Sequence, residues 1–152
     1  MSETRERPRR GPRGRAHAVA ASILLALFVF RVGAQLWQSF APTSLLPPFQ
    51  AWHSGALAYP ALVAAQIAII VFVVWLVQGF WRGAIPPSAA VGRWSTWIGL
   101  AYLVGAVLRL GLGLTVARDV PFLGDLLPAF FHIVLASIVL VAADYFRAGA
   151  GR

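Results

Sequence analysis

The sequence predicts an all-α membrane protein, an antiparallel bundle of four transmembrane helices with both termini cytoplasmic and a short interfacial helix between the first two spans. Three observations lead to this prediction. Hydrophobic residues make up 59% of the 152 residues and charged residues only 12%, whereas soluble domains carry about 25% charged residues. The apolar residues form four runs of roughly the 20 residues that a helix needs to cross a bilayer. Arg residues gather on one side of those runs, as they do in cytoplasmic loops.

Four spans and short connections use almost the whole chain, so we expect no separate soluble domain. The expected organisation is an arm over 1–16, a transmembrane domain over 17–148 and a tail over 149–152. The arm is rich in Arg and contains two prolines and two acids, a composition that buries little apolar surface and favours disorder. We expect this arm to rest against anionic lipid headgroups and not to bind nucleic acid.

The first span is predicted at about 18–40, where an apolar run begins at Ala18 and continues beyond Arg31. The basic stretch before it and the sequence Val32-Gly33-Ala34 also resemble a cleavable secretory signal. Because Arg31 interrupts the run before that site and the apolar character resumes after it, we expect the span to be retained. Cleavage would leave the other three spans with the same orientation.

The connection over 41–60 carries no acidic or basic residue other than a histidine, and it contains four prolines. Phe49, Trp52, His53 and Ala56 recur at the spacing of one helical face. This spacing predicts a short helix that lies in the membrane interface and ends near Gly55.

The remaining spans are predicted at about 61–81, 94–116 and 126–146. Most of the aromatic residues with a polar atom fall near the ends of predicted spans, as an aromatic belt requires: Trp37, Trp52, Trp81, Trp94, Trp97 and Tyr145. The arm, the turn over 82–93 and the tail over 147–152 carry Arg, while the opposite side has only Arg118, outweighed by Asp119 and Asp125. This asymmetry places both termini in the cytoplasm, with the chain in the plasma or inner membrane.

Each span contributes a polar residue at a similar depth. At 1.5 Å of rise per residue, these residues lie roughly 12 to 14 Å below the outer ends of their spans. A charge at mid-membrane costs about 2.5 to 3.5 kcal/mol, so such groups face the interior of a bundle. Together with Gln35, one turn after Arg31, they form the candidate ligand-binding set: Arg31, Gln35, Gln66, Arg109 and His132.

Two arginines at this depth without a carboxylate leave positive charge unbalanced, and three interpretations are open. Arg31 or Arg109 extends outward to Asp119, Asp125 or lipid phosphate. Alternatively, the arginines hold an anion such as a carboxylate, a phospholipid or an isoprenoid phosphate. In the third interpretation, a partner subunit or a second copy of the chain supplies the missing carboxylate.

The two outer connections contain a candidate acid–base group at the mouth of the bundle, formed by His53 with Asp119 or Asp125. The alternative is an ordinary interfacial turn in which Ser54 bonds its own backbone. Near the opposite face, Asp144 and Arg147 have the i, i+3 spacing of a helical ion pair, and Arg82 or Arg93 are alternative partners for Asp144.

Composition excludes several chemistries. The chain has no Cys and no Lys, which removes disulfides, thiolate metal sites and Schiff-base chemistry. No His cluster suits a metal, and His132 has no second histidine at its depth for bis-histidine haem ligation. We therefore expect no metal and no cofactor.

Two functional hypotheses follow. The first is a non-enzymatic accessory or assembly protein with partnered interior polar groups and no cavity. The second is a lipid-, quinone- or anion-binding protein, an enzyme or a carrier, with an outward-facing pocket between Arg31, Arg109 and His132. The first hypothesis is favoured, and an enzymatic role is disfavoured because no motif defines a reaction. Coupled transport is also disfavoured, because no acid lies at mid-membrane.

Overall fold

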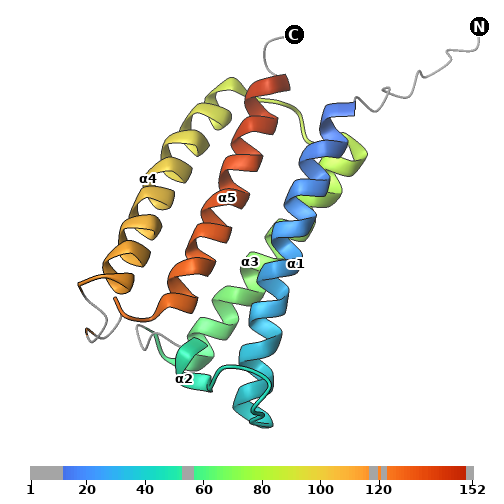
Figure 1. The fold of residues 1–152 in the computed structure, drawn as a ribbon. Coiled ribbons are helices and arrows are strands. Elements are labelled where there is room, and N and C mark those ends of the chain that lie inside the picture. Colours follow the sequence, from blue (N-terminus) through green and yellow to red (C-terminus); the bar gives the residue numbers. More distant parts are fainter. Residues whose placement is uncertain (1–11, 53–56, 117–119, 121–122, 150–152) are drawn as a thin grey trace, which may run out of the picture.

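The computed structural model describes residues 12–52, 57–116, 120 and 123–149, and it is all-helical in that part of the chain. Its helices are α1 (Pro12–Phe40), α2 (Phe49–Trp52), α3 (Tyr59–Arg82), α4 (Ala89–Leu114) and α5 (Leu126–Gly149). The four long helices of the described residues are each long and apolar enough to cross a membrane. The prediction of four spans, with a short helix after the first, is confirmed (Figure 1).

The first helix begins earlier than the predicted span. It starts at Pro12, inside the stretch predicted as an arm, whose first eleven residues lie outside the described part. Proline is favourable in a first helical turn, and contacts with α3 accompany the extension. A Cβ on Gly14 would lie 3.3 Å from the carbonyl oxygen of Phe80, and the Arg15 guanidinium lies 6.0 Å from the Trp81 ring.

The turn between α3 and α4 is built by local signals. Gly83 adopts a left-handed conformation with φ of 63°, and the amide of Ala84 donates to the Gly79 carbonyl at 3.0 Å. These are features of a Schellman cap, which ends α3. Ser88 then caps α4, since its hydroxyl accepts from the amide of Val91 at 3.4 Å, so α4 begins five residues before the predicted 94.

The long helices pack in the order α4, α5, α1, α3, so that α4 packs mainly on α5 and α3 mainly on α1. The core lies where α1 faces its neighbours: one buried cluster joins Ala21 of α1, Val73 of α3 and Ile138 of α5. Figure 1 shows α1 beginning and α5 ending at the same end of the bundle, with α2 at the opposite end.

Small residues permit the close approach of α4 to α5. The residues of α4 that are buried at the interface with α5 include Gly92, Gly99, Ala106 and Gly113, which recur every seven positions. A Cβ on Gly92 would lie 2.9 Å from the backbone nitrogen of Arg147. A seven-residue spacing keeps one face turned toward a neighbouring helix, and small residues on that face let two backbones come close.

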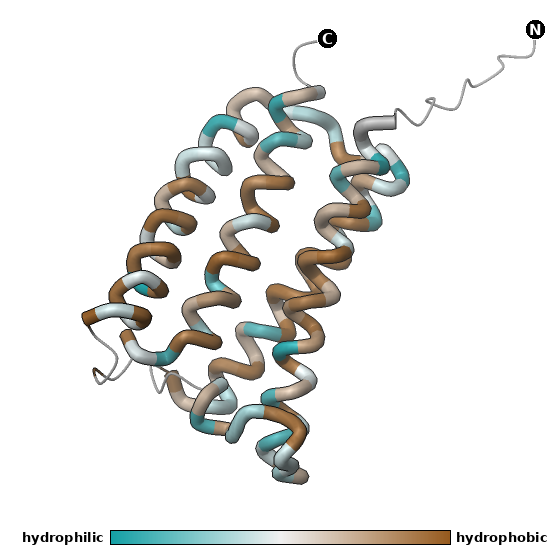
Figure 2. Tube along the Cα trace, in the orientation of Figure 1, coloured by the Kyte–Doolittle hydropathy of each residue, from teal (hydrophilic) through white to brown (hydrophobic). Residues whose placement is uncertain are grey.

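Apolar side chains cover the outward faces of the long helices. Phe30, Val71, Trp97 and Ile98 are among many large hydrophobic residues that are more than half exposed. Figure 2 shows hydrophobic segments along the central turns and hydrophilic ones mainly toward the helix ends. Such a surface suits lipid and not water, so the chain is a multi-pass membrane protein.

Candidate functional site

The described part of the chain has five buried polar or charged side chains: Arg31, Gln35, Gln38, Gln66 and Arg109. Three of them share one face of α1, because Gln35 and Gln38 follow Arg31 by four and seven residues. The structure therefore turns the polar face of α1 inward. None of the five is acidic, so hydrogen bonds to neutral groups carry much of the compensation.

Arg31 lies under the short helix α2. Its guanidinium donates a hydrogen bond to the carbonyl of Trp52 at 3.2 Å, and it lies 5.5 Å from the centre of the Phe131 ring, within cation–π range. Trp52 is only 3% exposed and packs in a cluster with Ala34, Phe131 and Val134. The guanidinium is therefore held between the backbone at the end of α2 and the Phe131 ring of α5.

Gln35 and Gln66 join α1 to α3. The side-chain amide of Gln66 donates to the Gln35 side-chain oxygen at 3.2 Å, and both residues are at most 3% exposed. Interhelical bonds of this type hold transmembrane helices together. The Gln35 amide nitrogen and the Nε of Arg31 are buried without a hydrogen-bond partner in the structure.

His132 of α5 lies opposite Tyr102 of α4, and the Tyr102 hydroxyl is 2.6 Å from Nδ1 of His132. Arg31 and Arg109 both act electrostatically on each of these two residues. Arg31 and Arg109 therefore lie within electrostatic range of the Tyr102–His132 contact. Gln35 and Gln66 form the neighbouring pair between α1 and α3.

Tyr102 was not among the predicted site residues. It precedes Arg109 by seven positions and therefore shares its helical face, a signal that identifies the face of the helix but not the partner. Arg109 also interacts electrostatically with Asp125, which lies just before α5. The other two residues of the predicted outer mouth, His53 and Asp119, lie outside the described residues.

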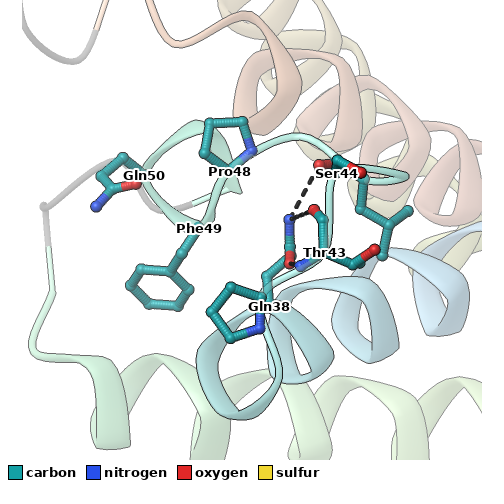
Figure 3. A pocket seen from close by; sticks show the side chains of 8 residues that line it. Gln38, Thr43, Ser44, Pro48, Phe49 and Gln50 are labelled. Atoms are coloured by element: carbon teal, nitrogen blue, oxygen red, sulfur yellow. Dashed lines mark hydrogen bonds between the residues drawn. The ribbon is translucent and has the colours of Figure 1, made fainter.

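Gln38 organises the connection between α1 and α2 (Figure 3). Its amide nitrogen lies within hydrogen-bond distance of three carbonyls, those of Thr43 at 3.0 Å, Leu46 at 3.0 Å and Pro47 at 2.7 Å. Its oxygen accepts from the amide of Thr43 at 2.7 Å. The indole nitrogen of Trp52 donates to the same Pro47 carbonyl at 2.8 Å, so Gln38 indirectly positions the residue whose carbonyl bonds Arg31.

A cavity of about 680 Å³ lies beside this connection and is lined by residues including Gln38, Thr43, Pro48 and Phe49. A second, largely apolar groove of about 420 Å³ lies between α3, α4 and α5 and reaches Tyr102. Neither Arg31, Arg109 nor His132 lines this groove. Its polar lining residues are Ser95 and Tyr102.

The predicted Asp144–Arg147 clamp is replaced by a different pair. Asp144 forms its ion pair with His17, whose Nε2 lies 2.8 Å from the carboxylate. The neighbouring Tyr145 donates to the Ile85 carbonyl at 2.8 Å and stacks on Phe80 with ring centres 4.1 Å apart. The clamp therefore joins the start of α1 to the end of α5, which local spacing within α5 did not predict.

Among the described residues, no group of three or more His, Asp or Glu side chains is arranged to hold a metal ion. No protein-family model, curated protein or solved structure matches this chain.

Proposed function

We propose that this chain is a non-enzymatic accessory or assembly protein, embedded in a plasma or inner membrane with both termini in the cytoplasm. The observation that carries the proposal is the bond from Arg31 to the Trp52 carbonyl, with the guanidinium over the Phe131 ring. A guanidinium that is bonded within the chain and covered by an aromatic side chain suits a structural role better than a role in binding a diffusing substrate.

The other polar contacts support the same role. Gln66 with Gln35 links α1 to α3, Tyr102 with His132 links α4 to α5, and Gln38 holds the connection. Each contact joins two elements that the lipid alone would leave free to separate. The polar layer then serves to specify one arrangement of the helices.

The expected partner is another membrane subunit or a second copy of this chain. The helix α4 packs mainly on α5, which leaves large side chains such as Trp94, Trp97 and Ile98 exposed on its other faces. These faces contact either lipid or a protein partner. Anionic lipid headgroups are the expected partners of the Arg-rich first segment.

The orientation has a direct test, because the chain contains no cysteine. Single Cys residues at Ser88, between α3 and α4, and at Ser44, between α1 and α2, provide matched labelling positions. A membrane-impermeant maleimide applied to intact cells should label Ser44→Cys and leave Ser88→Cys unlabelled until the membrane is opened. The reverse pattern would contradict the proposed orientation.

The accessory role is tested by mass spectrometry of both the protein and the lipid that co-purify in a mild detergent. We expect a stoichiometric membrane-protein partner or a defined homo-oligomer, and a bound-lipid profile that is the same for the wild type and Arg31→Gln. A stoichiometric small molecule lost in Arg31→Gln, with the fold intact, would overturn the accessory role.

That outcome would support the second candidate, a protein that binds a lipid, a quinone or another anion at the polar layer. The observation that favours it is the pair of buried donors without partners, Nε of Arg31 and the amide nitrogen of Gln35. Both require an acceptor, which a carboxylate, a phosphate or a carbonyl group supplies. Gln35→Met should then release the ligand, while Gln78→Met, at an exposed position of α3, should retain it.

A further inference from the structure

Because α3 packs mainly on α1 and α4 mainly on α5, α3 and α4 make few contacts with each other, and a groove lies between them and α5. Its walls include Phe72 and Trp75 of α3, Val91 of α4, and Val139 and Phe146 of α5. All of these residues belong to spans that can cross a membrane. The groove therefore opens toward the hydrocarbon region, and its occupant is apolar.

The dimensions of the groove select the kind of occupant. On α4 it extends from Val91 to Tyr102, a length of roughly 16 Å at 1.5 Å per residue. A groove of this length, with a volume of about 420 Å³ and a largely apolar lining, accommodates a single aliphatic chain, whose carbons contact neighbours at about 4 Å.

The position of the groove indicates from which membrane leaflet its occupant enters. Its end near Val91 and Phe146 lies close to the end of the bundle where α1 begins and α5 finishes, and its other end reaches Tyr102 in mid-span. The Tyr102 hydroxyl is engaged with His132, so the phenol ring closes the groove at that depth. A hydrocarbon chain that enters the groove from the leaflet nearest the protein termini would end against this ring.

The charged residues at the open end of the groove indicate which lipid headgroup would be favoured there. Arg82 and Arg147 are exposed at this end, and the Arg147 side chain crosses α4 at Gly92, next to Val91. The carboxylate of Asp144 is paired with His17. The exposed Arg147 beside the mouth favours a negatively charged headgroup.

We propose that the groove between α3, α4 and α5 binds one hydrocarbon chain of an anionic lipid from the leaflet on the side of the termini, with its headgroup near Arg147. This site adjoins the polar layer at Tyr102, but it does not depend on the accessory role or on the second candidate function.

The test uses the full chain in nanodiscs that contain a small fraction of phosphatidylglycerol with a diazirine on one acyl chain. After illumination, labelled peptides are identified by mass spectrometry. We expect the label to concentrate on groove residues of α3, α4 and α5. Labelling spread evenly over the exposed faces of all spans would overturn the proposal, and so would a crosslink between copies at the groove.

A matched pair of variants tests the site itself. Val91→Phe fills the groove, while Val104→Phe places the same ring on a lipid-facing position of α4 that does not line it; the two valines are 45% and 56% exposed. We expect groove labelling in Val91→Phe to fall about tenfold, the loss expected when roughly two buried CH₂ groups are displaced. Equal labelling in both variants would overturn the proposal. Ser95→Phe, which fills the groove one turn further in, provides a second blocking variant should Val91→Phe fail to fold.

The preference for an anionic headgroup is tested by comparison with phosphatidylcholine that carries the same diazirine-labelled acyl chain. We expect stronger groove labelling from phosphatidylglycerol, and we expect Arg147→Gln to remove that difference while chain labelling persists. Equal labelling by the two probes in the wild type would overturn the preference for an anionic lipid.

Discussion

The guanidinium of Arg31 bonds to the backbone carbonyl of Trp52, a residue 21 positions further along the chain, at a distance of 3.2 Å. A charge in mid-membrane is thus compensated by the carbonyl at the end of the four-residue helix α2, whose last carbonyls have no partner within the helix. Arg31 is only 7% and Trp52 only 3% exposed, so the packed residues around this contact keep it from lipid and water. The stability of the outer half of the bundle therefore depends on a connection outside the four spans.

The first prediction concerns the buried side chain of Trp52. Trp52→Ala should lower the free energy of unfolding by about 3 kcal/mol, the typical cost of removing a buried Trp side chain, and should also expose the Arg31 guanidinium. Thermal unfolding in mild detergent measures the effect. Trp97→Ala is the matched control, because Trp97 is 66% exposed and its removal should change the melting temperature little. Equal losses of stability in the two variants would show that burial of Trp52 does not stabilise the fold.

The second prediction concerns the amide pair between α1 and α3. Gln66→Leu should destabilise the protein by about 0.6 kcal/mol and at most about 1.7 kcal/mol, the average and the maximum for interhelical hydrogen bonds in membranes. Gln78→Leu, on the exposed face of the same helix, should have almost no effect. A double-mutant cycle with Gln35→Leu measures the pairwise coupling, and a coupling of zero would mean that the hydrogen bond does not stabilise the fold.

The third prediction uses two glycines of α4. Gly92→Ala places a methyl group 2.9 Å from the Arg147 backbone nitrogen and 3.2 Å from the Ala143 carbonyl oxygen, so we expect a loss of about 1 to 3 kcal/mol from overpacking. A Cβ on Gly105 meets nothing within 4 Å. Gly105→Ala should therefore stabilise the helix by up to about 1 kcal/mol through helix propensity. Opposite signs in thermal unfolding are the expected result, and the same sign for both would contradict the close α4–α5 contact.

The fourth prediction concerns the ion pair between His17 and Asp144, at the end of the bundle near the termini. Asp144→Asn should cost only about 0.2 to 1 kcal/mol, because the Asp144 side chain is 74% exposed and exposed ion pairs contribute little. The loss should shrink as salt screens the pair. Measuring the melting temperature of both proteins at low and high salt tests this, and a difference that grows with salt would argue against an ion pair.

Much of the layout was predictable from local properties. A bilayer requires each span to satisfy its own backbone hydrogen bonds, so hydropathy and length identify α1, α3, α4 and α5. Depth along a helix follows from the rise per residue, and for this reason Arg31, Gln66, Arg109 and His132 were predicted at similar depth. The seven-residue spacing of Gly92, Gly99, Ala106 and Gly113 was also present in the sequence, although it did not enter the prediction.

The sequence by itself determined the four helices, their approximate ends and the inward turn of the polar face of α1. Only the tertiary structure decided which helices are neighbours, and therefore which side chains meet. It paired His17 with Asp144 and Tyr102 with His132, bonded Arg31 to the Trp52 carbonyl and left a groove between α3 and α4. The physical reason is that helix length and depth depend on the backbone and the solvent, whereas the neighbours of a helix depend on how all the spans fit together.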